Sequence, residues 1–361
     1  MKSIIILLSI LILPGSHLFS QNIDKIIAEV EKNNTTLIAL RKRADAERIG
    51  NKTGQYLSNP EFAFNYLWGS PENIGNRKDI SILQSFDFPT AYSYRNQISE
   101  YRNIQVELEY EKELKSIITE VRLVCNGLVY HNSMRNELKK RTENARKLAE
   151  SYKTRYDIGE ASLIDYNKAQ VYLLNIIKDA EANEIDKNAL LAELKILNGG
   201  IPVEFNDSVF QLQTIPNDFE QWYVQVELNN PVLQWLKQEV SISRKNEKLN
   251  TAMSLPKLHA GYMSEDVVGQ QYQGIAFGVT IPLFENKNTV KYAKAKTAAM
   301  ESAEADTRMQ FYNKLKALHT KAVNMQNSLN DFQINLQKHS NSGLLPKALD
   351  NGELSLAEYF Y

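Results

Sequence analysis

The sequence predicts a mainly α-helical protein with a small β part, built from two copies of one unit. Three observations predict this fold class. Long segments carry apolar residues at helical spacing, short segments alternate apolar and small or polar residues, and several motifs recur nearly 200 residues further along. The chain of 361 residues has 42 Lys and Arg against 43 Asp and Glu, so it lacks the basic excess typical of nucleic-acid binding. We therefore expect no nucleic-acid partner.

The N-terminal segment predicts export. Lys2 precedes an apolar run from Ile4 to Leu13, Pro14-Gly15 breaks the run, and the small residue Ser20 stands directly before Gln21. This pattern is typical of a secretory signal peptide over residues 1–20, and the run is too short for a membrane-spanning helix. The only cysteine, Cys125, lies far from the expected cleavage site, so we expect no lipid anchor. No later segment of the sequence is long and apolar enough for a membrane-spanning helix, so any crossing of a membrane must be made by strands.

Internal similarity divides the mature chain into two repeats. The segment beginning Asn33-Asn34 recurs as Asn229-Asn230, and the segment around Asp157-Ile158-Gly159-Glu160 recurs around Asp350-Asn351-Gly352-Glu353. We expect a first repeat over residues 21–202, a linker or equatorial segment over 203–228, and a second repeat over 229–361. Because the chain ends soon after the second motif, we expect the second repeat to be truncated and to lack a return helix.

Each repeat is expected to begin with a helix, over residues 23–55 and again over 232–253. After two short strands comes a very long helix, over 94–152 and again over 289–339. A glycine-containing turn leads to a return helix over 163–197 in the first repeat. The first long helix carries one narrow apolar stripe, typical of a coiled-coil seam, which is interrupted at Glu111. The stripe comprises Tyr94, Ile98, Tyr101, Ile104, Leu108, Leu114, Ile118, Val121, Cys125 and Leu128.

The strands show the most informative alternation. In the first repeat, four aromatic side chains alternate with other residues and are expected to share one face of a strand over 61–68. In the second repeat, large apolar residues alternate with Gly, Ala and Thr. This pattern fits transmembrane barrel strands with their apolar side toward lipid, and it also fits a small sheet on a soluble core. The residues expected to face lipid are Phe62, Phe64, Tyr66, Trp68, Ile275, Phe277 and Val279.

Export and strand number favour the membrane interpretation. Four strands are too few to close a barrel, and open sheet edges are not tolerated in lipid. Three chains would supply twelve strands. We therefore expect a homotrimer whose four strands per chain contribute to a twelve-stranded outer-membrane β-barrel, with the long helices forming a coiled-coil α-barrel.

These features together resemble the TolC-type outer membrane efflux proteins. The residues that carry the resemblance are the run from Tyr156 to Asp165 with Ala169-Gln170, and its second copy from Gly352 to Glu358. Asn230-Pro231, Leu255-Pro256-Lys257 and the run from Gly278 to Phe284 resemble the second half of these proteins. The absence of an acylated N-terminal cysteine and of a last helix departs from the family pattern. The resemblance implies that this last helix takes part in closing the helical barrel.

The resemblance implies a passive trimeric conduit of a tripartite efflux system. It would contact outer membrane lipid, extend into the periplasm, and work with a periplasmic adaptor (membrane fusion) protein and an inner-membrane pump. Selectivity in such systems lies largely in the pump, so drugs, metal cations, polysaccharides and secreted proteins are not distinguished. A general likeness of the second half favours metal cations or small toxic compounds.

The turn between the long helix and the return helix is the expected site of adaptor contact. Gly159 and Gly352 stand where the chain must reverse, and Ser162 and Ser355 follow as candidate N-caps. Charged residues here would contact the adaptor or line the periplasmic entrance, and a solvated tip without selectivity is the alternative. The tip residues are Arg155, Gly159, Glu160, Ser162, Leu163, Asp165, Gly352, Glu353, Ser355, Leu356 and Glu358.

Enzyme functions find no support in the sequence. The five histidines form no zinc-type motif, and we find no phosphate-binding glycine loop or nucleophile elbow. We expect no catalytic residue, no cofactor and no metal site. An exported periplasmic coiled-coil adaptor or structural protein remains as the alternative, although neither predicts a duplicated unit with a hairpin in each copy.

Overall fold

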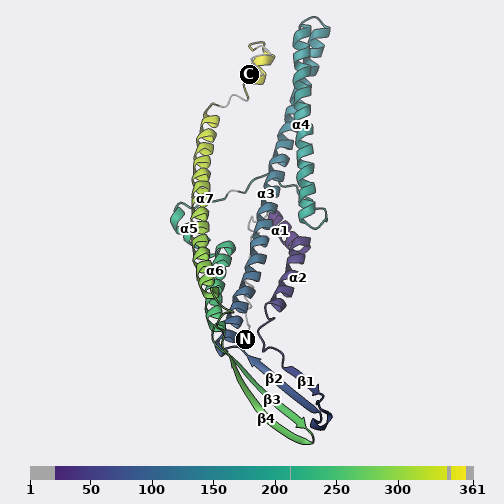
Figure 1. Cartoon of the computed structure of the whole chain (residues 1–361). Coiled ribbons are helices and arrows are strands. Elements are labelled where there is room, and N and C mark those ends of the chain that lie inside the picture. The colour runs from purple at the N-terminus through teal and green to yellow at the C-terminus, as the bar shows by residue number, and fades with distance from the viewer. Residues whose placement is uncertain (1–20, 212, 340–342, 355–361) are drawn as a thin grey trace, which may run out of the picture. The chain divides into compact units, whose positions relative to one another are not determined.

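The computed structural model describes residues 21–211, 213–339 and 343–354. Figure 1 shows a chain dominated by long helices, with one four-stranded sheet. In chain order the elements are α1 (Gln21–Asn33), α2 (Thr35–Gly50), β1 (Glu61–Leu67), a 3₁₀ turn (Glu72–Ile74), β2 (Arg77–Phe86), α3 (Pro89–Asp157), α4 (Leu163–Leu197), α5 (Phe219–Leu228), α6 (Pro231–Met253), β3 (Lys257–Val267), β4 (Gln270–Thr280), α7 (Thr289–His339) and α8 (Leu345–Asp350).

The chain divides into two compact units. Among the residues that the structure describes, one unit draws on 21–38, 114–211, 213–214, 331–339 and 343–354, and the other on Ala39–Glu113 and Ile215–Asn330. The first unit contains α1, α4 and the C-terminal part of α3. The second contains the whole sheet with α2, α5 and α6, the start of α3 and most of α7.

The long helices confirm the sequence prediction closely. Both α4 and α7 have the predicted limits, 163–197 and 289–339, and α3 extends the prediction to 69 residues. At 1.5 Å per residue, α3 is about 100 Å long. Pro89 begins α3, where a missing backbone N–H costs nothing and the fixed φ suits the first helical turn.

The expectation of one helix over 23–55 is wrong. The helix is interrupted at Asn34, and its second part ends at Gly50. Asn34 is buried, its Oδ1 accepts a hydrogen bond of 3.0 Å from the Leu37 N–H, and its Nδ2 donates to the Leu197 carbonyl at 2.8 Å. The side chain therefore caps α2 and satisfies the last carbonyl of α4 at once, which favours a break at this residue.

The second repeat uses the matching asparagine in the same way. Asn230 caps α6 by accepting hydrogen bonds from the N–H groups of Val232 and Leu233, at 2.8 and 3.2 Å. The helix before it, α5, lies inside the segment predicted to be a linker and occupies the place that α1 has before Asn34. Phe219 anchors α5 by packing its ring against that of Tyr312 on α7, with 5.5 Å between the centroids.

Five of the ten predicted stripe residues on α3 are buried: Ile98, Leu108 and, with no exposed surface, Val121, Cys125 and Leu128. Tyr94, Tyr101, Leu114 and Ile118 are half-buried. Two positions differ from the prediction. Ile104 is exposed while its neighbour Gln105 is buried and donates a hydrogen bond of 2.8 Å to Glu239 on α6. Ile117 rather than Ile118 is fully buried. Sequence spacing does not resolve a shift of one residue around a helix of this length.

The four strands form one antiparallel sheet in the order β1-β2-β3-β4. Each repeat supplies one hairpin, and β2 pairs with β3 to join the two repeats. β2, β3 and β4 have 10 or 11 residues and β1 has 7. Strands of about 9–11 residues span a bilayer when tilted.

Candidate functional site

The register of the sheet brings the predicted lipid-facing residues of both repeats onto one face. Directly paired residues of antiparallel strands share a face. One row crosses the whole sheet: Phe62 on β1 pairs with Ile82, Ile82 pairs with Tyr262, and Tyr262 pairs with Ile275 on β4. By the same register this face, which we call the apolar face, carries Phe62, Phe64, Tyr66, Ile80, Ile82, Phe86, Leu258, Ala260, Tyr262, Ile275, Phe277 and Val279, together with the polar side chains of Lys78, Gln84, Ser264, Asp266, Gln271 and Gln273.

The apolar face is the more exposed of the two. Phe277, Ile275 and Phe62 are 81%, 76% and 66% exposed, whereas Ala63, Ser81 and Ala276 on the opposite face are half-buried. Trp68, which was predicted to continue β1, lies just beyond its end and rests its ring edge-on against Tyr66. Soluble proteins rarely expose contiguous apolar patches of this kind without a partner or a membrane to cover them.

The opposite face, which we call the polar face, carries mainly small and hydrogen-bonding side chains, with the apolar side chains of Leu67, Leu83, Met263 and Val267 among them. His259 lies between two hydroxyls, with its Nδ1 2.9 Å from Ser85 Oγ and its Nε2 2.6 Å from Thr280 Oγ1. Gly261 has no room for a side chain, because a Cβ there would lie 2.3 Å from the Ile82 carbonyl oxygen. His259 therefore links three strands by hydrogen bonds.

A hollow of about 350 Å³ lies along the polar face near the far ends of the hairpins. Its lining includes Asn65, Arg77, Asp79, Glu265 and Tyr272 from all four strands.

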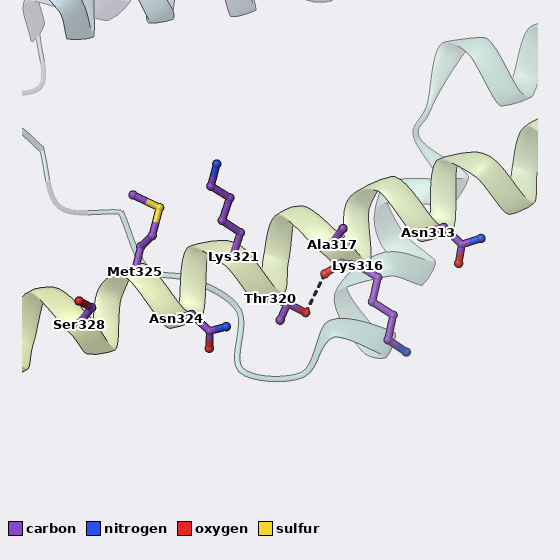
Figure 2. A pocket seen from close by; sticks show the side chains of 8 residues that line it. All are labelled: Asn313, Lys316, Ala317, Thr320, Lys321, Asn324, Met325 and Ser328. Carbon is purple, nitrogen blue, oxygen red and sulfur yellow. Dashed lines mark hydrogen bonds between the residues drawn. The ribbon is translucent and has the colours of Figure 1, made fainter.

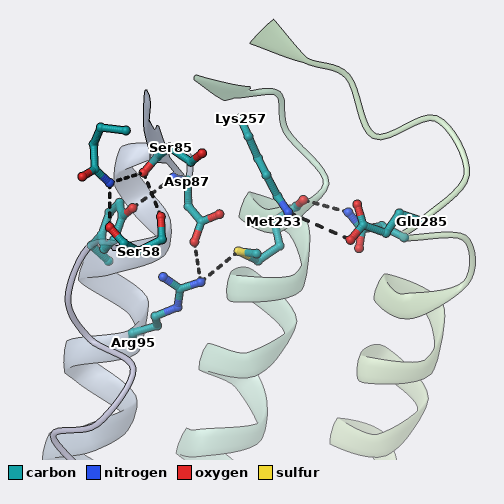
Figure 3. Close-up of polar contacts among 10 residues, drawn as sticks. Ser58, Ser85, Asp87, Arg95, Met253, Lys257 and Glu285 are labelled. Atoms are coloured by element: carbon teal, nitrogen blue, oxygen red, sulfur yellow. Dashed lines mark hydrogen bonds and ion pairs between the residues drawn. The ribbon is translucent and has the colours of Figure 1, made fainter. Parts of the chain in front are cut away.

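A polar network stabilises the junction where strands meet helices (Figure 3). Arg95 of α3 donates to Asp87 at 2.6 Å and lies 3.3 Å from the Met253 sulfur at the end of α6. Asn286, beyond β4, donates to the Met253 carbonyl at 2.8 Å. Three strand–helix connections of the second unit are thus joined through Met253. The sequence analysis missed this network, because its members are far apart in the chain and form no motif.

The predicted reversal at Gly159 is confirmed in detail. Gly159 has φ +80°, its N–H donates to the Tyr156 carbonyl, and the Glu160 N–H donates to the Arg155 carbonyl at 2.7 Å. These two hydrogen bonds form a Schellman motif, which ends a helix with a residue of positive φ. No atom of another residue lies within 4 Å of a Cβ built at Gly159, so backbone conformation and not space favours glycine.

Ser162 caps the return helix as predicted. Its Oγ accepts a hydrogen bond of 3.1 Å from the Asp165 N–H and donates to the Asp165 carboxylate at 2.7 Å. The two side chains therefore satisfy each other at the first turn of α4, a variant of the capping box. Asp165 is half-buried, so its main contribution here is to the cap.

Several exposed side chains surround this turn. Arg155, Glu160 and Leu163 are exposed, as predicted for a contact surface. Ile158 and Ile164, which the site prediction omitted, are also exposed, at 63% and 65%. The signal that could have identified them is a large apolar residue directly beside a reversal, where no core is available to bury it.

The hairpin behind the tip packs through small residues and one ring. Ala149 and Tyr152 of α3 are buried against Ala169 of α4. Burial raises the pKa of the Tyr152 hydroxyl, and the Arg155 guanidinium, 5.8 Å from the ring centre, partly opposes this shift. Tyr156 and Tyr166 stack nearly parallel, with centroids 5.7 Å apart.

The second tip repeats the hydrogen bonds of the first. Gly352 has φ +75°, its N–H donates to the Leu349 carbonyl, and the Glu353 N–H donates to the Ala348 carbonyl at 2.9 Å. Gly352 and Glu353 are exposed. The other predicted tip residues of this repeat lie outside the described residues: Ser355, Leu356 and Glu358.

A hollow of about 700 Å³ lies along α7 (Figure 2). All eight of its lining residues belong to this one helix, and Lys316 and Lys321 point away from each other. Because a single helix lines it, the hollow brings no set of polar groups together. Among the residues that the structure describes, no three His, Cys, Asp or Glu side chains are placed to hold a metal ion.

None of the described helices is long and apolar enough to span a bilayer. No protein-family model matches the sequence, and no curated protein matches it.

Solved structures match the fold over nearly the whole chain. The CmeC outer membrane channel of Campylobacter jejuni is 18% identical with a TM-score of 0.72, covering 94% of this chain and 79% of CmeC. VceC, an outer membrane protein of Vibrio cholerae, is 12% identical with a TM-score of 0.74, covering 94% and 88%. CusC, described as forming a transmembrane channel, is 14% identical with a TM-score of 0.70, covering 94% and 84%. The fold implied by the sequence resemblance is therefore confirmed: this chain has the fold of the TolC-type outer membrane channels.

Proposed function

We propose that the protein is the outer-membrane component of a tripartite efflux system. Three copies would close their sheets into a twelve-stranded barrel and bring their long helices together as a periplasmic tube. Small toxic compounds or metal cations would pass through it from the periplasm to the outside. The conduit would carry out no chemistry of its own.

One observation carries this proposal: the sheet exposes large apolar side chains on one face and has a polar hollow on the other. In the described chain β1 and β4 each pair on one side only, so a single sheet has two open edges. Open edges cannot remain in lipid, and closure with further copies would satisfy them. The likeness to solved outer membrane channels supports the same arrangement.

The alternative of a periplasmic adaptor or structural coiled coil accounts for the helices but not for the sheet. A periplasmic protein would leave Phe277, Ile275 and Phe62 in water, where their exposure has no compensating contact. The two functions therefore differ in where the protein resides.

Cell fractionation with the full chain tests the proposal. We expect the protein in the outer membrane fraction and a trimer after detergent extraction. A monomer recovered from the soluble periplasm would contradict the proposal and favour the alternative.

We further propose that the two tips bind the periplasmic adaptor. Glu160 and Glu353 occupy equivalent positions in the two Schellman motifs, and both are exposed. Cysteines at these positions, in a Cys125→Ala background, are expected to crosslink to a periplasmic partner in cells. Cys125 is buried, so its removal leaves the surface unchanged. Burial also raises the pKa of its thiol to about 11, which lowers its reactivity.

A cysteine at Lys147, exposed in the middle of the α3–α4 hairpin, is the matched control. Crosslinks from Lys147→Cys but not from Glu160→Cys or Glu353→Cys would show that the adaptor binds elsewhere along the helices.

A further inference from the structure

Three charged side chains gather on the polar face near the hairpin ends. Arg77 Nε lies 2.8 Å from Asp79 Oδ1 and 3.0 Å from Glu265 Oε1. Asp79 and Glu265 are direct cross-strand partners on β2 and β3. Two carboxylates placed opposite each other repel, and the guanidinium between them offsets this repulsion.

The triad stands alone at its level of the sheet. In the row of Asp79 and Glu265, the remaining positions are Asn65 and Tyr272, which are neutral. The adjacent row toward the helices carries no charge on any of the four strands and consists of Ala63, Ser81, Met263 and Gly274. All three charged residues line the hollow on the polar face, so their charges face open space.

The triad carries two negative charges and one positive charge, which leaves a net charge of −1 for each chain. Three chains around one barrel would place three triads in a ring with a net charge of −3. Rings of charge in a narrow, low-dielectric passage act strongly on passing ions, because the walls focus the field.

We propose that Arg77, Asp79 and Glu265 set the charge selectivity of the pore at its outer end, in favour of small cations over anions. Arg77 moderates the ring by offsetting one of the two carboxylates in each chain. This inference rests on the proposed channel function. It concerns the hairpin ends of the sheet, away from the strand–helix connections.

Planar bilayers tested with the purified full chain provide the experiment. With a KCl gradient across the bilayer, the reversal potential reports the ratio of K⁺ to Cl⁻ permeability. The concentrations should lie near about 0.1 M, where the Debye length is about 10 Å. We expect the wild type to be cation-selective. Arg77→Gln doubles the net negative charge of the ring and should raise the ratio about threefold or more, since pore potentials reach several kT. Arg77→Lys keeps the charge and should leave the ratio near that of the wild type.

The opposite change should reverse the preference. Asp79→Asn combined with Glu265→Gln leaves Arg77 as the only charge of the triad, so the ring becomes positive and the pore should favour Cl⁻. All of these differences should shrink at about 1 M salt, where the Debye length is only about 3 Å.

Lys78→Gln is the matched control. Lys78 is exposed, directly follows Arg77 and lies on the apolar face, where it pairs with Tyr66 and Asp266. Its loss removes the same charge from the other side of the sheet and should leave the ratio unchanged. If conductance steps appear but the ratio of K⁺ to Cl⁻ permeability is the same in every variant, or changes only in Lys78→Gln, this inference is overturned and the channel function is not. Absence of conductance steps from the wild type would overturn the channel function together with it.

Discussion

The sheet and the α3–α4 hairpin distribute their apolar side chains in opposite ways. In the hairpin, Leu128 and Leu194 have no exposed surface, and most charged residues are exposed, with the buried Lys187 as an exception. In the sheet, Ile275 and Phe277 face outward and the triad of Arg77, Asp79 and Glu265 lines a hollow. Under the proposed channel function, the helices would meet water and the apolar face of the sheet would meet hydrocarbon.

The largest effect is expected from a cavity in the hairpin. Leu128→Ala should lower the free energy of unfolding by about 2–5 kcal/mol, because a fully buried leucine loses both its transfer energy and its packing. Urea unfolding followed by the helical circular dichroism signal measures this change. Leu123→Ala, on the exposed side of the same helix, should change stability by no more than about 0.5 kcal/mol. Equal losses for both variants would contradict the assigned core.

A charge on the apolar face of the sheet should have the next largest effect. It should act on insertion into the membrane. Phe64→Arg should cost about 2–4 kcal/mol of insertion energy near the bilayer midplane. Ala63→Arg is the control, since Ala63 lies on the polar face. The amount of each variant in the outer membrane fraction measures insertion. Greater damage from Ala63→Arg would mean that the two faces of the sheet are assigned the wrong way round.

Backbone conformation at the tip should matter less. Gly159→Val should cost about 1–2 kcal/mol, because a β-branched residue disfavours positive φ while the site itself is open. We expect the trimer to persist and efflux to fall. Gly159→Asn should restore efflux, since asparagine tolerates the left-handed conformation. A loss of efflux with asparagine as large as with valine would point to a role other than turn geometry.

The smallest effect is expected at the cap of the return helix. Ser162→Ala removes the acceptor of the Asp165 N–H and should cost about 1 kcal/mol. Faster hydrogen exchange of the Asp165 amide, with unchanged exchange in the middle of α4, is the expected result. Ser162→Thr should retain most of the protection, and an unchanged rate in the alanine variant would show that the cap contributes little.

The parts of the fold that follow local rules were predictable. Gly159 and Ser162 limit α3 and α4 through backbone conformation and capping, which depend on a few neighbouring residues. Alternation likewise assigned Phe62 and Ile275 to the outer sides of their strands. The repeated motifs extended both predictions to the second half of the chain.

The parts that depend on distant residues were not predictable. The hydrogen bond from Asn34 to the Leu197 carbonyl joins residues far apart in sequence, although the cap that Asn34 makes with the Leu37 N–H is local. Pairing of β2 with β3 places Glu265 opposite Asp79, and no local pattern in either strand indicates that register. The junction at Met253 and the charged triad on the polar face therefore emerged only from the folded chain.

The central claim is that the apolar face of the sheet meets lipid and the polar face meets water. Nitroxide labels at Phe277 and Ala276, neighbours on β4 that point to opposite faces, test it directly in the Cys125→Ala protein reconstituted in liposomes. The account predicts that the label at Phe277 collides mainly with dissolved oxygen, as in hydrocarbon, and that the label at Ala276 collides mainly with a water-soluble nickel complex. Water-like accessibility at Phe277, or lipid-like accessibility at Ala276, would contradict it.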